Sequence, residues 1–275
     1  MNKSADAAVA VSAPRPRNYY TEPARIDVAG LSTAYRREGK GEPVLFLHGA
    51  GLTRMWLPFY DAMAKSYEFI APEHPGFGGT PLPDWLSGIN DVVLHYDEFL
   101  HQLGIDGCHL VGYSLGGWLA AALASTYPRR FSSLTLIAPL GIRVDWGDIP
   151  DIFQVGPEGL WQRLFEDPSA MESVLPDAHN LDEIEHGYGE ASAFARLAWT
   201  PRYDIGLPRK LARVACPSLI VLPERDRLVP EAIGLAYAEA LPDVRVERIA
   251  GAGHALIVEQ PDAVASVIAK HCSGD

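Results

Sequence analysis

The sequence predicts an α/β fold built on a mostly parallel, eight-stranded sheet that is flanked by helices and interrupted by a helical cap insertion. Short apolar runs alternate along the chain with longer helical patterns, which implies parallel strands joined by right-handed crossovers. The central runs are apolar throughout rather than alternating, as in strands covered on both faces. Functional side chains should therefore collect on loops at the carboxyl ends of the strands.

Length separates the two kinds of apolar segment, because strands are short and helices are longer. Strands are predicted, in chain order, at Ala24–Val28, Leu31–Tyr35, Val44–Leu47, Phe69–Ala71, Cys108–Val111, Leu134–Ala138, Leu219–Leu222 and Val244–Ile249. Helices are predicted between them at Met55–Lys65, Val92–Leu103, Leu115–Tyr127, Glu231–Ala240 and Pro261–Lys270.

One segment breaks this rhythm. Residues 140–208 lack a clear strand, are rich in Gly, Pro and Trp, and contain helical patches at Glu158–Glu166 and Ile184–Thr200. We interpret this segment as a helical cap over the functional site. Residues 19–139 and 209–275 would then form the core.

Composition limits the classes of function. The chain has 275 residues, 48% of them hydrophobic, which is enough for a sizeable core. Its net charge of −12, without runs of like charge, argues against nucleic-acid and anionic-membrane partners. No apolar stretch approaches the length that spans a bilayer.

The first 18 residues are rich in Ala, Ser and Pro, and only Lys3 precedes their short apolar piece. This pattern favours a flexible leader over a signal peptide, and a cytoplasmic location. The three cysteines, Cys108, Cys216 and Cys272, cannot all pair and lack metal-ligand spacing, so we expect thiols in a reducing compartment.

The nucleophile candidate is Ser114, in the pentapeptide Gly112-Tyr113-Ser114-Leu115-Gly116 between a predicted strand and a predicted helix. A serine on such a tight turn has a strained backbone that lifts its hydroxyl out of the chain, and glycines two residues away avoid collisions. The alternative is a helix cap, because Gly-x-Ser-x-Gly occurs by chance and serine caps helices well.

A serine hydroxyl needs a base, and the base needs an acid that orients it. His254 is the base candidate, because it follows the last predicted strand in the glycine-rich loop Gly251-Ala252-Gly253-His254. Asp226 is the favoured acid, after the strand Leu219–Leu222. Glu224 is a nearby competitor, and Asp145, after the preceding strand, is an alternative.

An oxyanion hole needs two amide donors. Leu115 supplies one, because it follows the nucleophile, and Ala50 of the turn His48-Gly49-Ala50-Gly51 is the candidate for the other. This turn could instead cradle phosphate, but its spacing matches neither dinucleotide-binding nor Walker patterns. His48 itself is expected to brace the loop by a hydrogen bond.

Together these motifs resemble the α/β-hydrolase superfamily over nearly all of Tyr19–His271. The shared features are the His-Gly-x-Gly turn followed by Trp56, the turn His74-Pro75-Gly76-Phe77-Gly78, the serine turn, Asp226 with Val229-Pro230 behind it, and Gly253-His254 with Glu259-Gln260-Pro261. The resemblance implies the α/β-hydrolase fold, a triad in the order Ser114, Asp226, His254, and no cofactor or metal.

Ser114 argues against dehalogenases and epoxide hydrolases, because members of those classes with this fold carry aspartate at that position. Meta-cleavage product hydrolases, which cleave C–C bonds, keep a serine at this position. They resemble this chain in the stretch Arg196-x-x-Trp199. They often have a tryptophan soon after the histidine, where this chain has Ala255-Leu256-Ile257. Cofactor-free haloperoxidases and lactonases are further alternatives.

We therefore expect a serine hydrolase that acts on a small-molecule ester or lactone. C–C bond hydrolysis and a receptor-like, ligand-binding role are the alternatives, and pairing as a homodimer is left open. Candidates for an apolar pocket wall are Trp56, Tyr113, Trp161 and Trp199. Trp118, on the predicted helix after the serine, is expected in the core.

Overall fold

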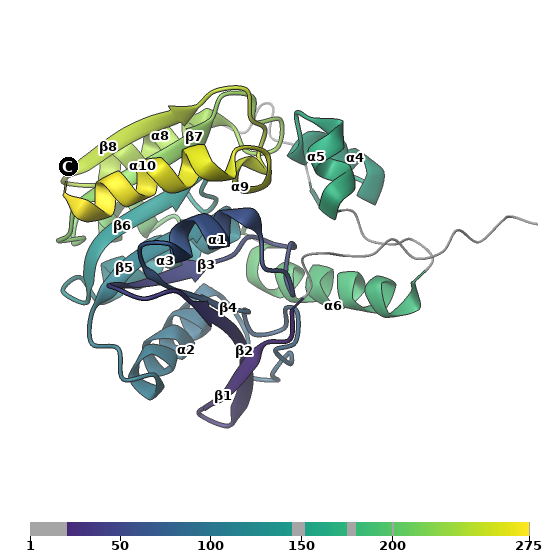
Figure 1. Ribbon diagram of the computed structural model, residues 1–275, viewed down its shortest axis with the longest axis horizontal. Helices are drawn as coiled ribbons and strands as arrows, with labels where there is room; N and C mark the ends of the chain where they lie inside the picture. The colour runs from purple at the N-terminus through teal and green to yellow at the C-terminus, as the bar shows by residue number, and fades with distance from the viewer. Residues whose placement is uncertain (1–20, 145–151, 175–179, 200, 275) are drawn as a thin grey trace, which may run out of the picture.

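The computed structural model describes residues 21–144, 152–174, 180–199 and 201–274. These residues form an eight-stranded sheet with the strand order β1-β2-β4-β3-β5-β6-β7-β8, flanked by helices (Figure 1). The predicted α/β fold with a mostly parallel sheet is confirmed. The predicted leader lies outside the described residues.

The strands agree closely with the apolar runs of the sequence. β3 to β8 pair in parallel, whereas β2 runs antiparallel to both β1 and β4. Their bounds are β1 Ala24–Val28, β2 Leu31–Glu38, β3 Pro43–Leu47, β4 Glu68–Pro72, β5 Cys108–Tyr113, β6 Phe131–Ile137, β7 Ser218–Pro223 and β8 Val244–Ile249.

Helices cover both faces of the sheet. Figure 1 shows α1 and α10 on one face, where they pack on each other, while α3 packs against α2 and α7 on the other face. The bounds are α1 Pro58–Ala64, α2 Ile89–Gln102, α3 Leu115–Thr126, α7 Leu207–Leu211, α8 Glu231–Ala240, α9 Leu256–Glu259 and α10 Pro261–Ser273.

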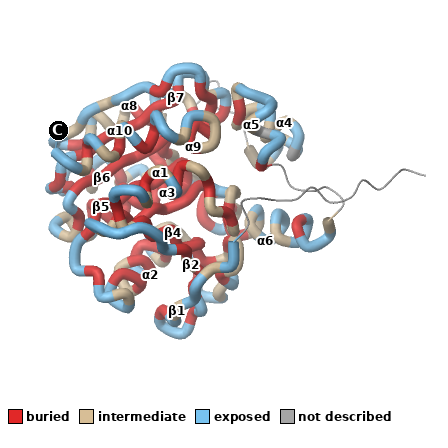
Figure 2. Tube along the Cα trace, in the orientation of Figure 1, coloured by how far each residue is buried: buried red, intermediate tan, exposed pale blue. Residues whose placement is uncertain are grey.

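The sheet separates two hydrophobic clusters, and its central strands are buried on both faces (Figure 2). Every residue of β5 is buried, which explains why this strand is apolar without alternation. Trp118 is 3% exposed in the cluster on the α3 side, so it is a core residue as expected.

Differences from the predicted elements concern short segments. The first helix begins at Pro58 rather than Met55, because Leu57 is still extended and proline occupies the first turn. The sequence did not predict α7 and α9, which have five and four residues and so carry too little periodicity to be recognised.

The described part of the 140–208 segment contains α4 Pro157–Leu164, α5 Pro168–Val174 and α6 Leu181–Ala198. In Figure 1 these helices lie beyond the edge of the sheet at which β7 and β8 end. α5 was not predicted. Among the described helices, none is long and apolar enough to cross a bilayer.

Candidate active site

Ser114 is held in a strained conformation between β5 and α3. Its φ of 54° and ψ of −113° are unusual for a residue with a side chain. The surrounding backbone enforces this geometry: its N–H donates to the carbonyl of Ile137 (2.9 Å), and its carbonyl accepts from the amide of Leu140 (3.1 Å). The strain is the feature that the sequence pattern predicted for a nucleophile whose hydroxyl is lifted out of the chain.

The flanking glycines are required by close backbone contacts. A Cβ on Gly112 would lie 2.2 Å from the carbonyl oxygen of Gly116, and a Cβ on Gly116 would lie 1.9 Å from the carbonyl oxygen of Leu47. The second contact also shows that the end of β3 lies directly against the serine turn.

The structure brings the three predicted catalytic groups together. Ser114 Oγ lies 2.9 Å from His254 Nε2, and His254 Nδ1 lies 2.7 Å from Asp226 Oδ2. Because the carboxylate can only accept, Nδ1 carries the proton and Nε2 is free to accept from the serine hydroxyl. This is the tautomer in which an imidazole can act as a base toward Ser114.

Asp226 and His254 are both fixed by hydrogen bonds that involve the backbone, and both are shielded from solvent. The other carboxylate oxygen of Asp226 accepts from the amides of Leu228 (2.8 Å) and Val229 (2.7 Å). The Tyr113 hydroxyl donates to the carbonyl of His254 (3.1 Å). The side chains of His254 and Asp226 are 1% and 6% exposed, so water competes little for their contact.

The turn that carries the second oxyanion candidate lies beside the serine. A Cβ on Gly49 would be 3.2 Å from Cβ of Ser114, so this backbone approaches the nucleophile closely. Leu115 opens α3, and the amides of a first helical turn lack partners within the helix. Ala50, the next residue after Gly49, is exposed. The amides of Ala50 and Leu115 therefore lie on two adjacent turns.

His48 braces this turn rather than reacting. Its Nδ1 donates to the carbonyl of Gly49 (2.6 Å), and its Nε2 accepts from the amide of His74 (3.0 Å). His74 Nε2 returns a bond to the carbonyl of His48 (2.7 Å), and Tyr96 donates to His74 Nδ1. Burial lowers the pKa of His48 to about 4, so the ring stays neutral.

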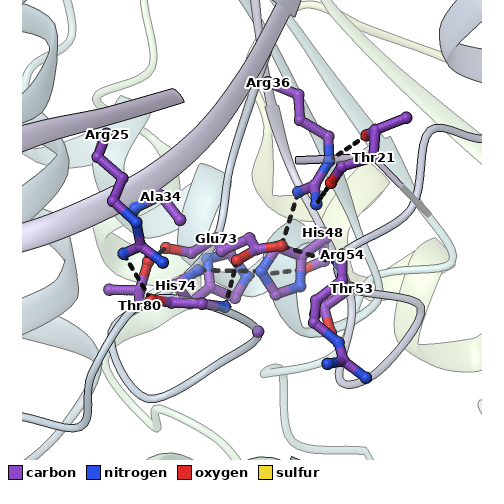
Figure 3. A network of polar contacts seen from close by, with 12 residues as sticks. Thr21, Arg25, Ala34, Arg36, His48, Thr53, Arg54, Glu73, His74 and Thr80 are labelled. Atoms are coloured by element: carbon purple, nitrogen blue, oxygen red, sulfur yellow. Dashed lines mark hydrogen bonds and ion pairs between the residues drawn. The ribbon is translucent and has the colours of Figure 1, made fainter. Parts of the chain in front are cut away.

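Glu73 extends this network, as Figure 3 shows. Its carboxylate accepts from Arg36 Nη1 (2.7 Å) and from the amide of Arg54 (2.8 Å), and it is 3% exposed. Leu52 and Arg54 have φ values of 58° and 61°, so the loop after the His48 turn is strained and needs such anchors. Glu73 was not predicted from the sequence, although it directly precedes the His74 motif.

Glu190 of α6 contacts the same region. It accepts hydrogen bonds from the Thr53 hydroxyl and from the amide of Gly78 (2.9 Å). Burial is the main cause that raises the pKa of this carboxyl above its ordinary value. Glu190 was not predicted either, because nothing in the local sequence distinguishes it from the other acidic residues of α6.

The four aromatic candidates for the pocket wall have different surroundings. Tyr113 is buried with its ring 5.3 Å from that of His254. Trp161 of α4 stacks on Phe165 and packs on the cluster that also contains Tyr113. Trp199 is 59% exposed, and Trp56 donates to Asp61 (2.6 Å) at α1. These contacts place Tyr113, and not Trp199 or Trp56, against the catalytic histidine candidate.

The competing acids have different outcomes. Glu224 is exposed and accepts from the amide of Gly251 (2.8 Å), which supports the histidine loop. Asp145 lies outside the described residues. Within the described ranges, no group of three or more His, Cys, Asp or Glu side chains is arranged to hold a metal ion.

Comparisons with known proteins identify the family of the chain. The sequence profile described as the alpha/beta hydrolase family matches residues 44–267. A pimeloyl-[acyl-carrier protein] methyl ester esterase of Aeromonas salmonicida is 28% identical over 260 residues, 86% of this chain and 98% of that protein. A 2-hydroxymuconate semialdehyde hydrolase of Pseudomonas sp. (strain CF600) is 27% identical over 263 residues, 88% of this chain and 91% of that protein.

Among solved structures, a bacterial membrane phospholipase A superimposes with a TM-score of 0.79 and 24% identity, covering 92% of this chain and 86% of that chain. This likeness concerns the fold. Since the family profile spans most of the chain, from β3 into α10, the protein belongs to the alpha/beta hydrolase family.

Proposed function

We propose that this protein is a serine hydrolase that cleaves a carboxylic ester or lactone through an acyl-enzyme on Ser114. The observation that carries the proposal is the continuous contact from Ser114 Oγ to His254 Nε2 (2.9 Å) and from His254 Nδ1 to Asp226 (2.7 Å). Such an arrangement turns a weakly nucleophilic hydroxyl into an effective one.

In the proposed acylation step, each of these groups has one role. Ser114 Oγ attacks the substrate carbonyl while His254 Nε2 takes its proton, and the fixed carboxylate of Asp226 stabilises the imidazolium that forms. The amides of Ala50 and Leu115 are the proposed donors to the tetrahedral oxyanion. The imidazolium then protonates the leaving alcohol, or the ring oxygen of a lactone, as the carbon–oxygen bond breaks.

Deacylation reverses the same steps with water. His254 removes a proton from water, the hydroxide attacks the acyl carbon, and the proton returns to Ser114 as the acid leaves. The helices α4, α5 and α6 are proposed as a cap that shapes the pocket for the acyl or alcohol group. Their position beyond the strand ends supports this role.

C–C bond hydrolysis is the second candidate. The 2-hydroxymuconate semialdehyde hydrolase relative favours it. Ala255, Leu256 and Ile257 after the histidine lie buried, where the C–C hydrolases often have a tryptophan. We rank the ester or lactone above it for this reason.

We further propose a cytoplasmic location. The three cysteines Cys108, Cys216 and Cys272 are free thiols, which suits a reducing compartment.

Two measurements separate the candidates. The first is labelling of the purified protein by a fluorophosphonate, with the Ser114→Ala variant as control. The second is turnover of a panel of p-nitrophenyl esters, lactones and vinylogous diketones. Labelling at Ser114 with ester or lactone turnover is expected. Turnover of the diketones alone would favour C–C cleavage, and labelling without any turnover would favour a receptor.

A further inference from the structure

We infer that Glu259 is a positioning residue for His254. Its carboxylate connects the histidine loop by hydrogen bonds to the turn between α4 and α5. The inference rests on the proposed function, because it assigns a role to the loop that carries the proposed base. Glu259 ends α9, five residues after His254.

The Glu259 carboxylate joins two segments of chain that are far apart in sequence. Its Oε2 accepts from the amide of Gly253 (2.7 Å), the residue directly before His254. Its Oε1 accepts from the amides of Glu166 and Asp167 (both 2.7 Å), which lie between α4 and α5. A half-buried carboxylate with three amide donors is a rigid connection.

The same turn contacts the histidine loop directly. The amide of Ala255, on the other side of His254, donates to the carbonyl of Leu164 (2.8 Å). A Cβ on Gly253 would lie 2.9 Å from both the Glu166 nitrogen and the Leu164 oxygen. Gly253 is therefore required by the close approach of this turn, and both neighbours of His254 are tied to it.

The turn is also bonded to the loop that carries the acid. Arg227, next to Asp226, donates to the carbonyl of Phe165 (2.8 Å) and pairs with Glu166 (2.7 Å). Arg225, the other neighbour of Asp226, also pairs with Glu166 (2.7 Å). The α4–α5 turn thus contacts residues on both sides of the proposed acid and of the proposed base.

The consequence is a loss of alignment when this connection is broken. In Glu259→Gln, one side of the amide still accepts, but its NH₂ group faces either Gly253 N–H or the amides of Glu166 and Asp167. Two donors then oppose each other and the histidine loop shifts. A misplacement of a catalytic group by about 1 Å can cost about 100-fold in rate.

The test compares the rate and the end point of fluorophosphonate labelling in the full chain. Glu259→Gln should label to one equivalent per chain, but about 10- to 100-fold more slowly than the wild type. Its kcat for p-nitrophenyl acetate should fall by a similar factor with little change in KM. Gly253→Ala should behave the same way, because its new Cβ pushes the α4–α5 turn aside. Asp262→Asn removes an exposed charge three residues further on and should match the wild type.

Each outcome is informative. A lower end point with an unchanged rate for the labelled fraction would mean a folding role and would overturn the inference. Labelling of Glu259→Gln and Gly253→Ala at the wild-type rate would overturn it as well, while leaving the proposed function intact. A wild-type protein that does not label at Ser114 would instead refute the proposed function.

Discussion

At the residue scale, the two oxygens of Asp226 have separate tasks. Oδ2 faces His254 Nδ1, while Oδ1 accepts from the amides of Leu228 and Val229. The carboxylate is thus held from behind while it orients the imidazole. Its orientation does not depend on the histidine.

This division predicts the effect of Asp226→Asn. The amide oxygen should stay with the two backbone donors, so the NH₂ group must face His254 Nδ1. The ring then takes the other tautomer, and its Nε2 can no longer accept the Ser114 proton. We expect kcat/KM for a p-nitrophenyl ester to fall about 10⁴-fold.

Asp145→Asn is the matched control, because Asp145 was the alternative acid from sequence. It should retain wild-type kcat/KM. If Asp145→Asn is crippled and Asp226→Asn is nearly silent, the acid has been assigned to the wrong loop.

At the scale of the elements, α6 and the α4–α5 turn contact different parts of the site. Glu190 of α6 accepts from Thr53 and Gly78, near the turn of the proposed oxyanion donor Ala50. The amides of Glu166 and Asp167 donate to Glu259, which also binds the loop of the proposed base His254. Contacts of both segments therefore reach the loops that carry the proposed catalytic residues.

Glu190 should respond to pH through its burial. Its pKa is raised above the ordinary 4.5, so the protonated form is favoured in the fold and the charged form costs stability as pH rises. Glu190→Gln keeps an oxygen for Thr53 and Gly78 but carries no charge. Its Tm should equal that of the wild type near pH 4 and exceed it at pH 8. A lower Tm than the wild type at pH 8 would contradict this account.

The aromatic residues of the proposed cap should differ in their effect on specificity. Trp161 packs on the buried cluster that also contains Tyr113, whereas Trp199 is 59% exposed and its ring lies tilted against that of Phe153. Trp161→Ala should lower kcat/KM for a bulky ester by about 10- to 200-fold relative to an acetyl ester, because only the bulky group uses the pocket wall. Trp199→Ala should change the two esters alike. Equal losses for both esters in Trp161→Ala would make Trp161 structural.

At the scale of the whole molecule, three buried histidines make the fold sensitive to acid. Burial is the main cause that lowers the pKa of His48 and His95 to about 4, and that of His74 well below 6.5. These rings are neutral in the fold but take up protons in the unfolded chain below pH 6.5. The contribution of these neutral histidines to the free energy of unfolding is therefore fully present above pH 6.5, and it is lost as the pH falls toward 4.

Urea unfolding between pH 6.5 and 4.5 measures this loss. The free energy of unfolding should fall across this range, and His95→Gln should reduce the slope by up to about 1.4 kcal/mol per pH unit, the value for one proton. Carboxylates contribute equally to both proteins and cancel in the difference. Identical slopes for wild type and variant would contradict the assignment.

The central parallel strands and the serine turn could be predicted from the sequence because their causes are local. The run of buried residues in β5 indicates a strand covered on both faces. The glycines around Ser114 indicate a turn with no room for side chains. Glu73 and Glu190 act through contacts with distant segments, so their sequence neighbours do not reveal their roles. Glu259 belongs to a recognisable motif after His254, but its contacts with Glu166 and Asp167 required the fold. The triad was predicted because each member also follows a strand, but its distances required the fold.

The central claim is that Ser114 carries the acyl group during turnover, and rapid mixing with p-nitrophenyl acetate tests it most directly. The account predicts a burst of one nitrophenolate per chain, and a quenched protein whose Ser114 peptide has gained one acetyl group. In Ser114→Ala both signals should vanish and turnover should drop by about 10⁴- to 10⁶-fold. An acetyl group on another residue, or a tenth of the activity remaining in Ser114→Ala, would contradict the claim.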